Sequence, residues 1–248
     1  MAQGLVARAG AALARAIPLN PIQSKLTQAI ASISFDDIPL SAARVGAPIL
    51  NQAGMSGTFY VCGGHTGKSF EDRPQHERSD LIALHEAGHE IACHSFAHPF
   101  VTRLNTAARD RDRLANADFI AQTLGDVRLS SFAYPYGAVS LSAKAYYARH
   151  FFTCRGVYRG LNRGRVDFGD LRAIGIERRQ HDMGQVRALI AEAVATQAWI
   201  IFFTHDVGPD PSAYGCRPQD LEDVIAALHD AKVETLPVKA AAAKLMFG

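Results

Sequence analysis

The stretch Ile30-Ala31-Ser32-Ile33-Ser34-Phe35-Asp36-Asp37 places a short apolar run directly before two adjacent carboxylates. Its first five residues, Ile30–Ser34, have the composition of a strand. A second informative segment, His94-Ser95-Phe96-Ala97-His98, follows another strand-like run and carries two imidazoles. Two imidazoles and one carboxylate can hold a metal ion, and the second carboxylate is left to accept a proton.

Runs rich in β-branched or aromatic residues alternate with helical segments along the chain. Such βα repetition predicts an α/β fold with a mostly parallel sheet, and seven or eight units suggest a closed barrel. We expect strands over Ile30–Ser34, Gly57–Val61, Glu90–Cys93, Ser130–Ala133, Phe151–Cys154, Leu171–Ile176, Trp199–Thr204 and Val233–Leu236, and helices over Asp80–Ala87, Thr106–Leu124, Met183–Gln197 and Pro218–Ala231.

The composition is that of one globular catalytic domain. The chain has 248 residues, of which 48% are hydrophobic and 20% charged, and a single α/β barrel accounts for this length. The formal net charge is only +2, and no cluster of basic residues lies among aromatic ones, so we expect no nucleic-acid partner. The four cysteines are far apart and form no CxxC pair, which fits reduced thiols in the cytoplasm.

The first part of the chain, residues 1–28, is expected to be a helical extension of a barrel domain that covers residues 29–248. Arginines interrupt its apolar run, so it predicts neither an export signal nor a membrane span. We therefore expect a cytoplasmic protein. Leu5, Leu13 and Ile17 suit an amphipathic helix that packs on the barrel, with a second subunit of a homodimer or the surface of the inner membrane as alternative partners.

Polar side chains follow four of the predicted strands at the point where each strand ends. The carboxyl ends of the strands form the active-site face of α/β barrels, so these side chains are expected to meet in one pocket. They are Asp36 and Asp37, His94 and His98, Tyr136, and His205.

Several motifs, taken in order, resemble those of the polysaccharide deacetylase family, the NodB-homology carbohydrate esterases. The resemblance spans roughly Ile30 to Leu236. It implies a distorted (β/α)7–8 barrel of the NodB-homology type and metal-dependent removal of N-acetyl groups from amino sugars. The motifs are Phe35-Asp36-Asp37, Ala87-Gly88-His89-Glu90-Ile91, His94-Ser95-Phe96-Ala97-His98, Phe132-Ala133-Tyr134-Pro135-Tyr136-Gly137 and Phe203-Thr204-His205.

The resemblance also implies roles for individual residues. The metal would be Zn²⁺, with Co²⁺, Mn²⁺ and Ni²⁺ as alternatives. Carried over by position, Asp37, His94 and His98 would bind it, Asp36 would be the general base, His205 the general acid, the backbone N–H of Tyr136 an oxyanion donor, and Phe203 part of a pocket for the acetyl methyl group.

The chain departs from the family pattern in two places that concern orientation. Ala133 stands where the family often has an arginine that orients the base, so Arg155, or as second choice Arg172, is expected to replace it. The aspartate that often orients the catalytic histidine has no evident counterpart. Asp206, Asp182 and Asp167 are the candidates. In addition, Ile38-Pro39 stiffens the loop after the paired aspartates.

Other interpretations of the motifs stay open. His85-Glu86-Ala87-Gly88-His89 spells the HExxH pattern of zinc peptidases, although Gly88 is expected to end the helix that this motif requires. Asp37, His94 and His98 could also form the facial triad of an iron oxygenase, and a sugar-binding barrel without catalysis is a further possibility.

The expected activity is removal of N-acetyl groups from GlcNAc-type amino sugars. The partner would be an N-acetylated glycan, either a polysaccharide, an oligosaccharide or a lipid-linked precursor, in a setting such as exopolysaccharide or adhesin synthesis. Deformylation of another lipid-linked sugar and hydrolysis of a small cyclic amide are the alternatives on the same barrel.

Overall fold

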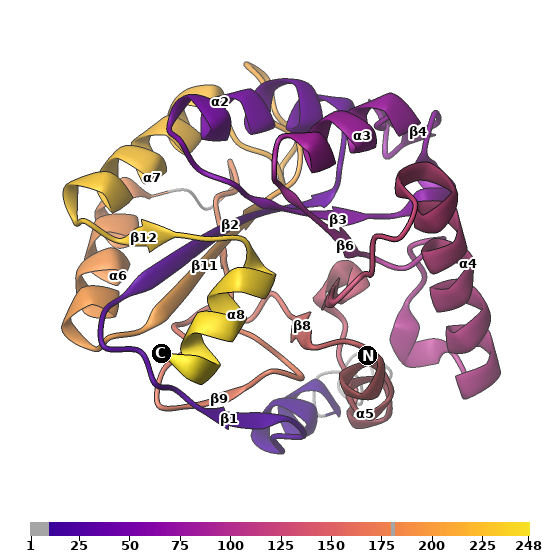
Figure 1. Ribbon diagram of the computed structural model, residues 1–248, viewed down its shortest axis with the longest axis horizontal. Helices are drawn as coiled ribbons and strands as arrows, with labels where there is room; N and C mark the ends of the chain where they lie inside the picture. Colours follow the sequence, from indigo (N-terminus) through magenta and orange to yellow (C-terminus); the bar gives the residue numbers. More distant parts are fainter. Residues whose placement is uncertain (1–9, 180–181) are drawn as a thin grey trace.

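A curled parallel sheet runs through the centre of the molecule, with helices around its outer face (Figure 1). The computed structural model describes residues 10–179 and 182–248. The strands follow one another in the spatial order β10-β11-β2-β3-β6-β7-β8, and β12 pairs with β2 in addition. Their bounds are β2 (Ile30–Asp37), β3 (Thr58–Val61), β6 (Glu90–Cys93), β7 (Ser131–Ala133), β8 (Thr153–Arg155), β10 (Ile174–Gly175), β11 (Trp199–Thr204) and β12 (Glu234–Thr235).

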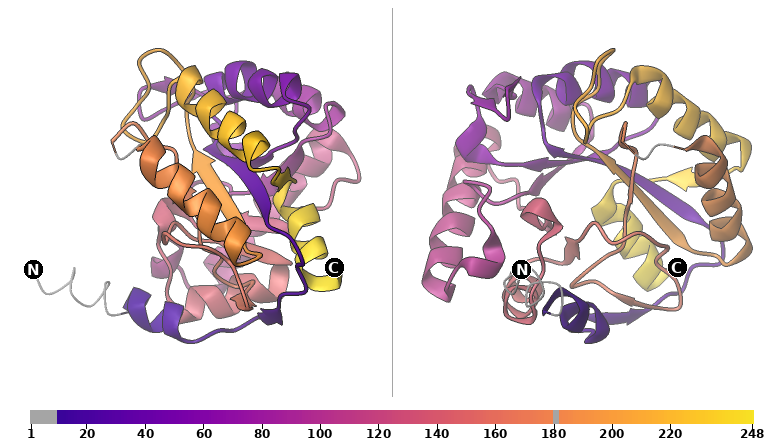
Figure 2. Two further views of the ribbon diagram at one scale, coloured as in Figure 1. Left: turned by 90° about the vertical axis from the view of Figure 1, so that its left-hand side faces the viewer. Right: turned by 180° about the vertical axis from the view of Figure 1, so that it is seen from behind.

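Most helices lie between strands in the chain and cover the outside of the sheet, whereas the last one, α8, follows the final strand. Seen from the side and from behind, α6 and α7 lie next to each other outside β11 (Figure 2). The α-helices are α2 (Ala47–Gln52), α3 (Arg78–Glu86), α4 (Thr106–Leu124), α5 (Leu141–His150), α6 (Met183–Ala195), α7 (Pro218–Asp230) and α8 (Val238–Phe247). Short helical turns cover Ala42–Gly46, Gly63–His65, Val101–Arg103 and Pro135–Gly137, and the short strands β1 (Pro21–Gln23), β9 (Arg165–Asp167), β4 (Ser69–Phe70) and β5 (Arg73–Pro74) form two antiparallel pairs.

The sheet closes on itself through the segment before β10. Leu171 forms a parallel bridge with Arg155 at the end of β8, through hydrogen bonds of 2.8 Å to the Cys154 carbonyl and 2.9 Å from the Gly156 N–H. The same segment then pairs with β11 as β10. The predicted distorted (β/α) barrel is therefore confirmed, with seven strands in the ring and β12 outside it.

The central strand β2 is buried along its whole length. It pairs with β11 on one edge, while β12 and β3 share the other edge. Two serines on this strand are fully buried and find partners: Ser32 Oγ donates to the Leu236 carbonyl at 2.7 Å, and Ser34 Oγ donates to the Phe202 carbonyl at 3.1 Å. A parallel strand that is covered on both faces has no water beside it, so each buried polar atom needs a hydrogen-bond partner within the protein.

The C-terminal helix α8 closes the amino-terminal end of the barrel. Its first backbone N–H groups donate to Thr58 Oγ1 and to the Glu90 carboxylate, both at 2.8 Å, and these residues begin β3 and β6. The apolar side of α8 packs in the same cluster as Trp199 and Ile30. The opposite end of the barrel, where the strands finish, stays available for a site.

The N-terminal segment contacts the barrel through a different residue from the ones expected. Residues 10–16 are helical, and Ala14 is fully buried, whereas Leu13 is 53% exposed. The Lys144 ammonium donates to the carbonyls of Ala14 and Ile17 at 2.6 and 2.8 Å. Leu5 lies outside the described residues. The division into residues 1–28 and 29–248 stays a prediction. Among the described residues, no helix is both long and apolar enough to span a membrane.

The predicted element boundaries are right at several strands and helices and wrong at others. The strands Glu90–Cys93 and Trp199–Thr204 and the helix Thr106–Leu124 begin and end as expected. In contrast, the first predicted strand continues to Asp37, and the fifth is displaced to end at Arg155. Both corrections place site side chains on the sheet itself, because pairing with the neighbouring strands extends further than the apolar run.

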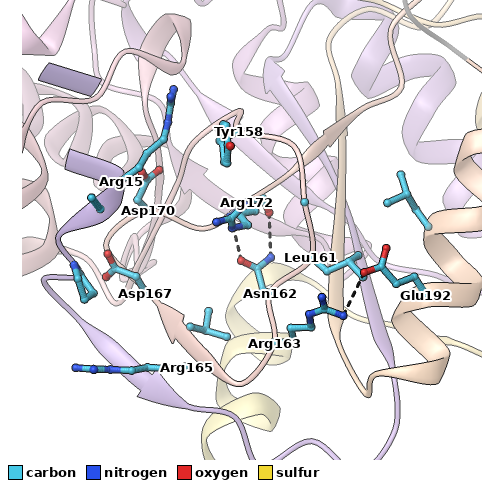
Figure 3. Close-up of a pocket in the computed structure, with 15 residues that line it drawn as sticks. Arg15, Tyr158, Leu161, Asn162, Arg163, Arg165, Asp167, Asp170, Arg172 and Glu192 are labelled. Atoms are coloured by element: carbon cyan, nitrogen blue, oxygen red, sulfur yellow. Dashed lines mark hydrogen bonds and ion pairs between the residues drawn. The ribbon is translucent and has the colours of Figure 1, made fainter. Parts of the chain in front are cut away.

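The molecule has one cavity at the carboxyl ends of the strands and a second cavity, of about 580 Å³, between the N-terminal segment, α6 and the chain around residues 158–172 (Figure 3). Arg172 lines this cavity, and its guanidinium lies over the ring of Tyr158. Asp170 lines it too, and burial raises the pKa of this carboxyl to about 6, against the opposing charges of Lys144 and Arg15.

Asp170 generates a prediction about stability. An unfolded aspartate has a pKa of ~3.9, so the folded chain holds the Asp170 proton more tightly and loses stability as pH rises from about 4 through 6. Relative to Asp170→Asn, the wild type should lose roughly 2 kcal/mol of unfolding free energy over that window. Urea unfolding of both proteins at several pH values measures this. Stability curves that stay parallel would contradict the assignment.

Candidate metal centre and active site

Three side chains at the carboxyl ends of β2 and β6 form a group that can hold a metal ion. The ligand atoms of Asp37, His94 and His98 all lie within 4.8 Å of one another, and all three residues are buried. Asp37 Oδ1 is 3.6 Å from His94 Nε2 and 3.4 Å from His98 Nε2. One oxygen and two imidazole nitrogens are a usual donor set for Zn²⁺ and related ions. The residues therefore fit the metal that the sequence predicts.

Hydrogen bonds fix the ligand form of His94. Its Nδ1 lies 2.9 Å from the carbonyl oxygen of Ala133. A carbonyl can only accept, so Nδ1 donates this hydrogen bond, and Nε2 is the nitrogen that faces Asp37 and can bind a metal ion. His98 is held in the neutral form, because burial, followed by the neighbouring His94, lowers its pKa to about 3. Neutral imidazoles are the form that binds a metal ion.

The loop that carries both histidines is tied to α4. The carboxylate of Asp112 accepts hydrogen bonds from the backbone N–H groups of Phe96 and Ala97, each at 3.0 Å. Ser95 Oγ accepts from the N–H of His98 at 3.0 Å. The sequence analysis did not identify Asp112, since a carboxylate within an exposed-looking helix gives no signal of its own.

Backbone strain is concentrated at this end of the barrel. Asp37, Ile38, Ser95, His98 and Tyr136 all have φ between 51° and 68°. This left-handed region is unfavourable for residues other than glycine, and most of all for a β-branched residue such as Ile38. Strained backbone of this kind persists where the surrounding structure enforces it, often at functional sites.

The second carboxylate, Asp36, is paired with Arg155. The Arg155 guanidinium donates to Asp36 Oδ1, and both side chains are almost completely buried. Burial by itself would raise the pKa of Asp36, but the charge of Arg155, followed by His94 and His205, outweighs it and holds the pKa below its usual value. Asp36 is therefore ionised at neutral pH. Of the two arginines expected as its partner, Arg155 makes the contact, whereas Arg172 lines the second cavity.

Arg155 itself is held by aromatic rings. Its guanidinium lies 4.9 Å from the ring centroids of both Tyr60 and Phe203. A further nitrogen donates to the Gly156 carbonyl at 3.0 Å. Ring faces attract a guanidinium and exclude water from it, so Arg155 is confined to the position that faces Asp36.

The remaining predicted residues line the cavity at the carboxyl ends of the strands, together with Asp36 and the possible metal ligands. This cavity has a volume of about 500 Å³. Tyr136 lies in the turn Pro135–Gly137, with its ring stacked on Phe100 at 4.1 Å between centroids. His205 directly follows β11, and its Nδ1 is 3.3 Å from the carbonyl oxygen of Tyr214. The cavity thus brings together Asp36, Asp37, His94, His98, Tyr136, Phe203 and His205, and it adds residues that the sequence analysis missed, among them Glu71, Arg159, Glu177, Arg179 and Tyr214.

A second possible ligand group shares Asp37 with the first. It consists of Asp37, Cys62 and His65, whose ligand atoms also lie within 4.8 Å of one another. Burial, followed by the nearby Asp37, raises the pKa of the Cys62 thiol, and its S–H already donates to the His94 carbonyl at 3.0 Å. Cys62 would have to lose both its proton and this bond to bind a metal, so the Asp-His-His group is the better site.

The HExxH pattern does not form a peptidase site. Helix α3 ends at Glu86, and Gly88 turns the chain with φ of 83°. His85 is exposed, whereas His89 is buried and accepts a hydrogen bond from the Gly57 N–H at 3.0 Å. The two histidines therefore do not lie on one face of a continuous helix, as metal binding by this motif requires.

Comparison with known proteins identifies the family of the chain. Residues 23–154 match the family described as polysaccharide deacetylase, which is more than half of the chain. The chain belongs to the polysaccharide deacetylase family. None of the curated proteins with which the sequence was compared matches it.

Several solved structures have a similar fold. The chitin deacetylase of the fungal pathogen Colletotrichum lindemuthianum is 16% identical, with a TM-score of 0.61 over 88% of this chain and 89% of that chain. A family 4 carbohydrate esterase from Streptomyces lividans, in complex with acetate, is 18% identical, with a TM-score of 0.58 over 85% and 92%. A peptidoglycan deacetylase from Bacillus subtilis is also 18% identical, with a TM-score of 0.53 over 86% and 90%.

The ligand group generates a prediction about metal binding. Replacing any one of Asp37, His94 or His98 with alanine removes one of three protein ligands and should abolish tight binding of Zn²⁺. Asp36→Asn should keep the ion, and His85→Ala, an exposed histidine outside the group, serves as the matched control. Metal analysis after dialysis and calorimetric titration measure the difference. Loss of the ion in Asp36→Asn with retention in Asp37→Asn would exchange the two roles.

The buried ion pair generates a second prediction. Arg155→Met leaves a buried carboxylate without its counter-charge, which should cost about 3–5 kcal/mol of unfolding free energy. Loss of Arg155 should also raise the pKa of Asp36. If the variant keeps any activity, the rise of that activity with pH should therefore occur at higher pH than in the wild type. Arg172→Met, the matched control, should stay within ~0.5 kcal/mol of the wild type. Equal costs in the two variants, measured by urea unfolding, would show that the pair does not stabilise the fold.

Proposed function

We propose that the protein is a metal-dependent hydrolase that removes N-acetyl groups from amino sugars. The observation that carries this proposal is the meeting, in one cavity, of the Asp37-His94-His98 group with two further titratable side chains, Asp36 and His205. Amide hydrolysis requires an activated water, a stabilised oxyanion and a protonated leaving nitrogen. The cavity offers a residue for each requirement.

Asp37, His94 and His98 would hold the divalent ion, most simply Zn²⁺, with Co²⁺, Mn²⁺ or Ni²⁺ as alternatives. The ion, when bound, supplies Lewis-acid polarisation of the substrate carbonyl and makes water a stronger acid. The rest of the chemistry falls to the side chains around it.

Asp36 would act as the general base toward the attacking water. Its ion pair with Arg155 keeps it ionised at neutral pH, and burial keeps competing solvent away from it. The same pair orients the carboxylate, because Arg155 is itself confined between two aromatic rings. A base that is both ionised and fixed in direction gives up less free energy to reorganisation during the reaction.

His205 would act as the general acid toward the departing amine. It directly follows β11, the strand that pairs with β2, and it lines the same cavity as Asp36. The backbone N–H of Tyr136 would donate to the developing oxyanion, and Phe203 would line the place of the acetyl methyl group. Phe203 is 4% exposed and thus presents little surface to the cavity, which suits a small acyl group.

The substrate is proposed to be an N-acetylated glycan of the GlcNAc type. Support comes from the family and from the solved relatives, whose names specify chitin and peptidoglycan deacetylation. We extend this to a polysaccharide, an oligosaccharide or a lipid-linked precursor, in exopolysaccharide or adhesin synthesis. Cytoplasmic placement, contact of the N-terminal helix with the inner membrane and assembly as a homodimer belong to the same proposal and rest on the sequence arguments alone.

Acetate release tests the proposed activity. We expect the zinc-loaded protein to release acetate from one or more members of a panel of N-acetylated glycans, and Asp36→Asn to release none. Glu86→Gln, which alters the HExxH pattern on the exposed surface of α3, should match the wild type. If the protein released formate or opened a cyclic amide but released no acetate, its substrate would be another small amide and not an N-acetyl sugar.

The general-acid role has its own prediction. His205→Ala should keep the metal and lower kcat on an N-acetyl sugar by about 10² to 10⁴, the usual contribution of a general acid. The loss should be much smaller for an activated aryl ester, since its leaving group departs without a proton. An equal loss of activity on the amide and on the ester would remove the acid role from His205.

A further inference from the structure

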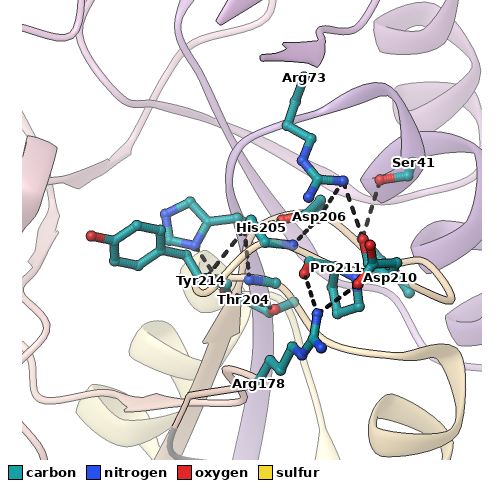
Figure 4. A network of polar contacts seen from close by, with 12 residues as sticks. Ser41, Arg73, Arg178, Thr204, His205, Asp206, Asp210, Pro211 and Tyr214 are labelled. Carbon is teal, nitrogen blue, oxygen red and sulfur yellow. Dashed lines mark hydrogen bonds and ion pairs between the residues drawn. The ribbon is translucent and has the colours of Figure 1, made fainter. Parts of the chain in front are cut away.

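The partner of His205 in this chain is a backbone carbonyl. Its Nδ1 lies 3.3 Å from the carbonyl oxygen of Tyr214 (Figure 4). This oxygen can only accept, so Nδ1 carries a proton, and Nε2 is the nitrogen left to face the substrate. The orientation of the ring therefore depends on where residue 214 holds its carbonyl.

The aspartates expected to orient His205 are engaged elsewhere. Asp167 pairs with Lys144 and accepts from the N–H of Asn20, on the side of β9. Asp182 caps α6 by accepting from the N–H of Gln185. Asp206 is next to His205 in the chain, but its carboxylate turns to the loop that follows β11.

Asp206 organises that loop through Ser212. One carboxylate oxygen accepts from the Ser212 N–H at 2.8 Å, and the other accepts from the Ser212 hydroxyl at 2.5 Å. The same hydroxyl accepts from the N–H groups of Tyr214 and Gly215, at 3.2 and 3.1 Å. A continuous chain of hydrogen bonds thus leads from Asp206 through Ser212 to Tyr214, the residue whose carbonyl contacts His205.

The loop is closed and anchored around this chain of bonds. The Cys216 N–H donates to the Asp206 carbonyl at 2.9 Å, and the Gly208 N–H donates to the Cys216 carbonyl at 3.1 Å. Gly215 passes so close that a Cβ there would lie 2.3 Å from Asp206 Oδ1. Arg73 lies 3.4 Å from the other oxygen of Asp206, which is 3% exposed. The bonds of this buried carboxylate with Ser212 and Arg73 therefore hold the loop in its conformation.

We propose that Asp206 and Ser212 are positioning residues for His205, which hold the Tyr214 carbonyl where it orients the imidazole. A carbonyl from a folded loop replaces the carboxylate expected for this task. The inference rests on the proposed function, because it assumes that His205 transfers a proton to the leaving nitrogen. It adds that two residues which do not face the substrate set the efficiency of that transfer.

The test compares Ser212→Ala with the wild type in zinc-loaded protein, using an N-acetyl sugar and an activated aryl ester. We expect kcat on the amide to fall about 10-fold, a part of what a general acid contributes, with KM and bound zinc unchanged and the ester rate within about twofold. Ser212→Thr, which keeps the hydroxyl, should restore the amide rate. Asp210→Ala is the matched control, because Asp210 lies in the same loop and its exposed side chain bonds only with Arg178 among the described residues.

A double-mutant cycle isolates the route of the effect. If Ser212 acts through His205, adding Ser212→Ala to His205→Ala should cause no further loss of amide hydrolysis. A further loss in that background, an equal fall on amide and ester, or an unchanged amide rate in Ser212→Ala would each overturn the inference. If Ser212→Ala does not fold, as judged by its thermal transition, Asp206→Asn takes its place, with the same expected pattern.

The two levels of the proposal fail in different ways. An inactive wild type, or a His205→Ala variant that loses amide and ester hydrolysis equally, would refute the proposed function or the acid role. A large, amide-specific loss in His205→Ala together with a wild-type rate in Ser212→Ala would refute only the positioning role of the loop.

Discussion

The buried ion pair between Asp36 and Arg155 is the interaction on which the site depends. It joins the carboxyl ends of β2 and β8, which are separated by β3, β6 and β7 in the sheet, so it forms only when the barrel has curled. Two charges that leave water together must face each other closely, because either one alone would be costly to bury. The need to keep this pair intact therefore constrains both the curvature of the sheet and the orientation of the Asp36 carboxylate.

The same constraint explains why the family pattern can vary at this point. The arginine lies at the end of β8 here, whereas Ala133 at the end of β7 occupies the position at which the sequence comparison expected it. These two residues lie opposite each other in the parallel ladder, with Ala133 in register with Arg155. Side chains at these two positions can reach the barrel interior at nearly the same depth. An arginine at either position could therefore form the ion pair with Asp36.

Two of the proposed metal ligands, His94 and His98, and the proposed acid, His205, lie on two loops, and these loops are stabilised in different ways. The His94–His98 loop is fixed by Asp112 of α4, which accepts from its backbone N–H groups. The loop after β11 is fixed from within, by Asp206 and Ser212. In both cases a carboxylate satisfies backbone donors that would otherwise be left without partners in a partly buried turn. The strained residues of the site are tolerated because such bonds determine the loop conformation.

The sequence by itself determined the order of the main strands, four of the α-helices, the family, and the place at the strand ends of the residues proposed as metal ligands and base. Those features are local: apolar runs mark β6 and β11, Gly125 marks the end of α4, and the paired aspartates directly follow an apolar run. It did not reveal α8, whose alanine-rich start lacks a side-chain cap and whose burial comes from the base of the barrel. It also left open the partners of Asp36 and His205. Only the tertiary structure decided that these partners are Arg155 and the Tyr214 carbonyl. Barrel closure brings Arg155 to Asp36, and folding of the loop brings the Tyr214 carbonyl to His205. Every residue has a backbone carbonyl, so a sequence pattern cannot show which one will be the partner.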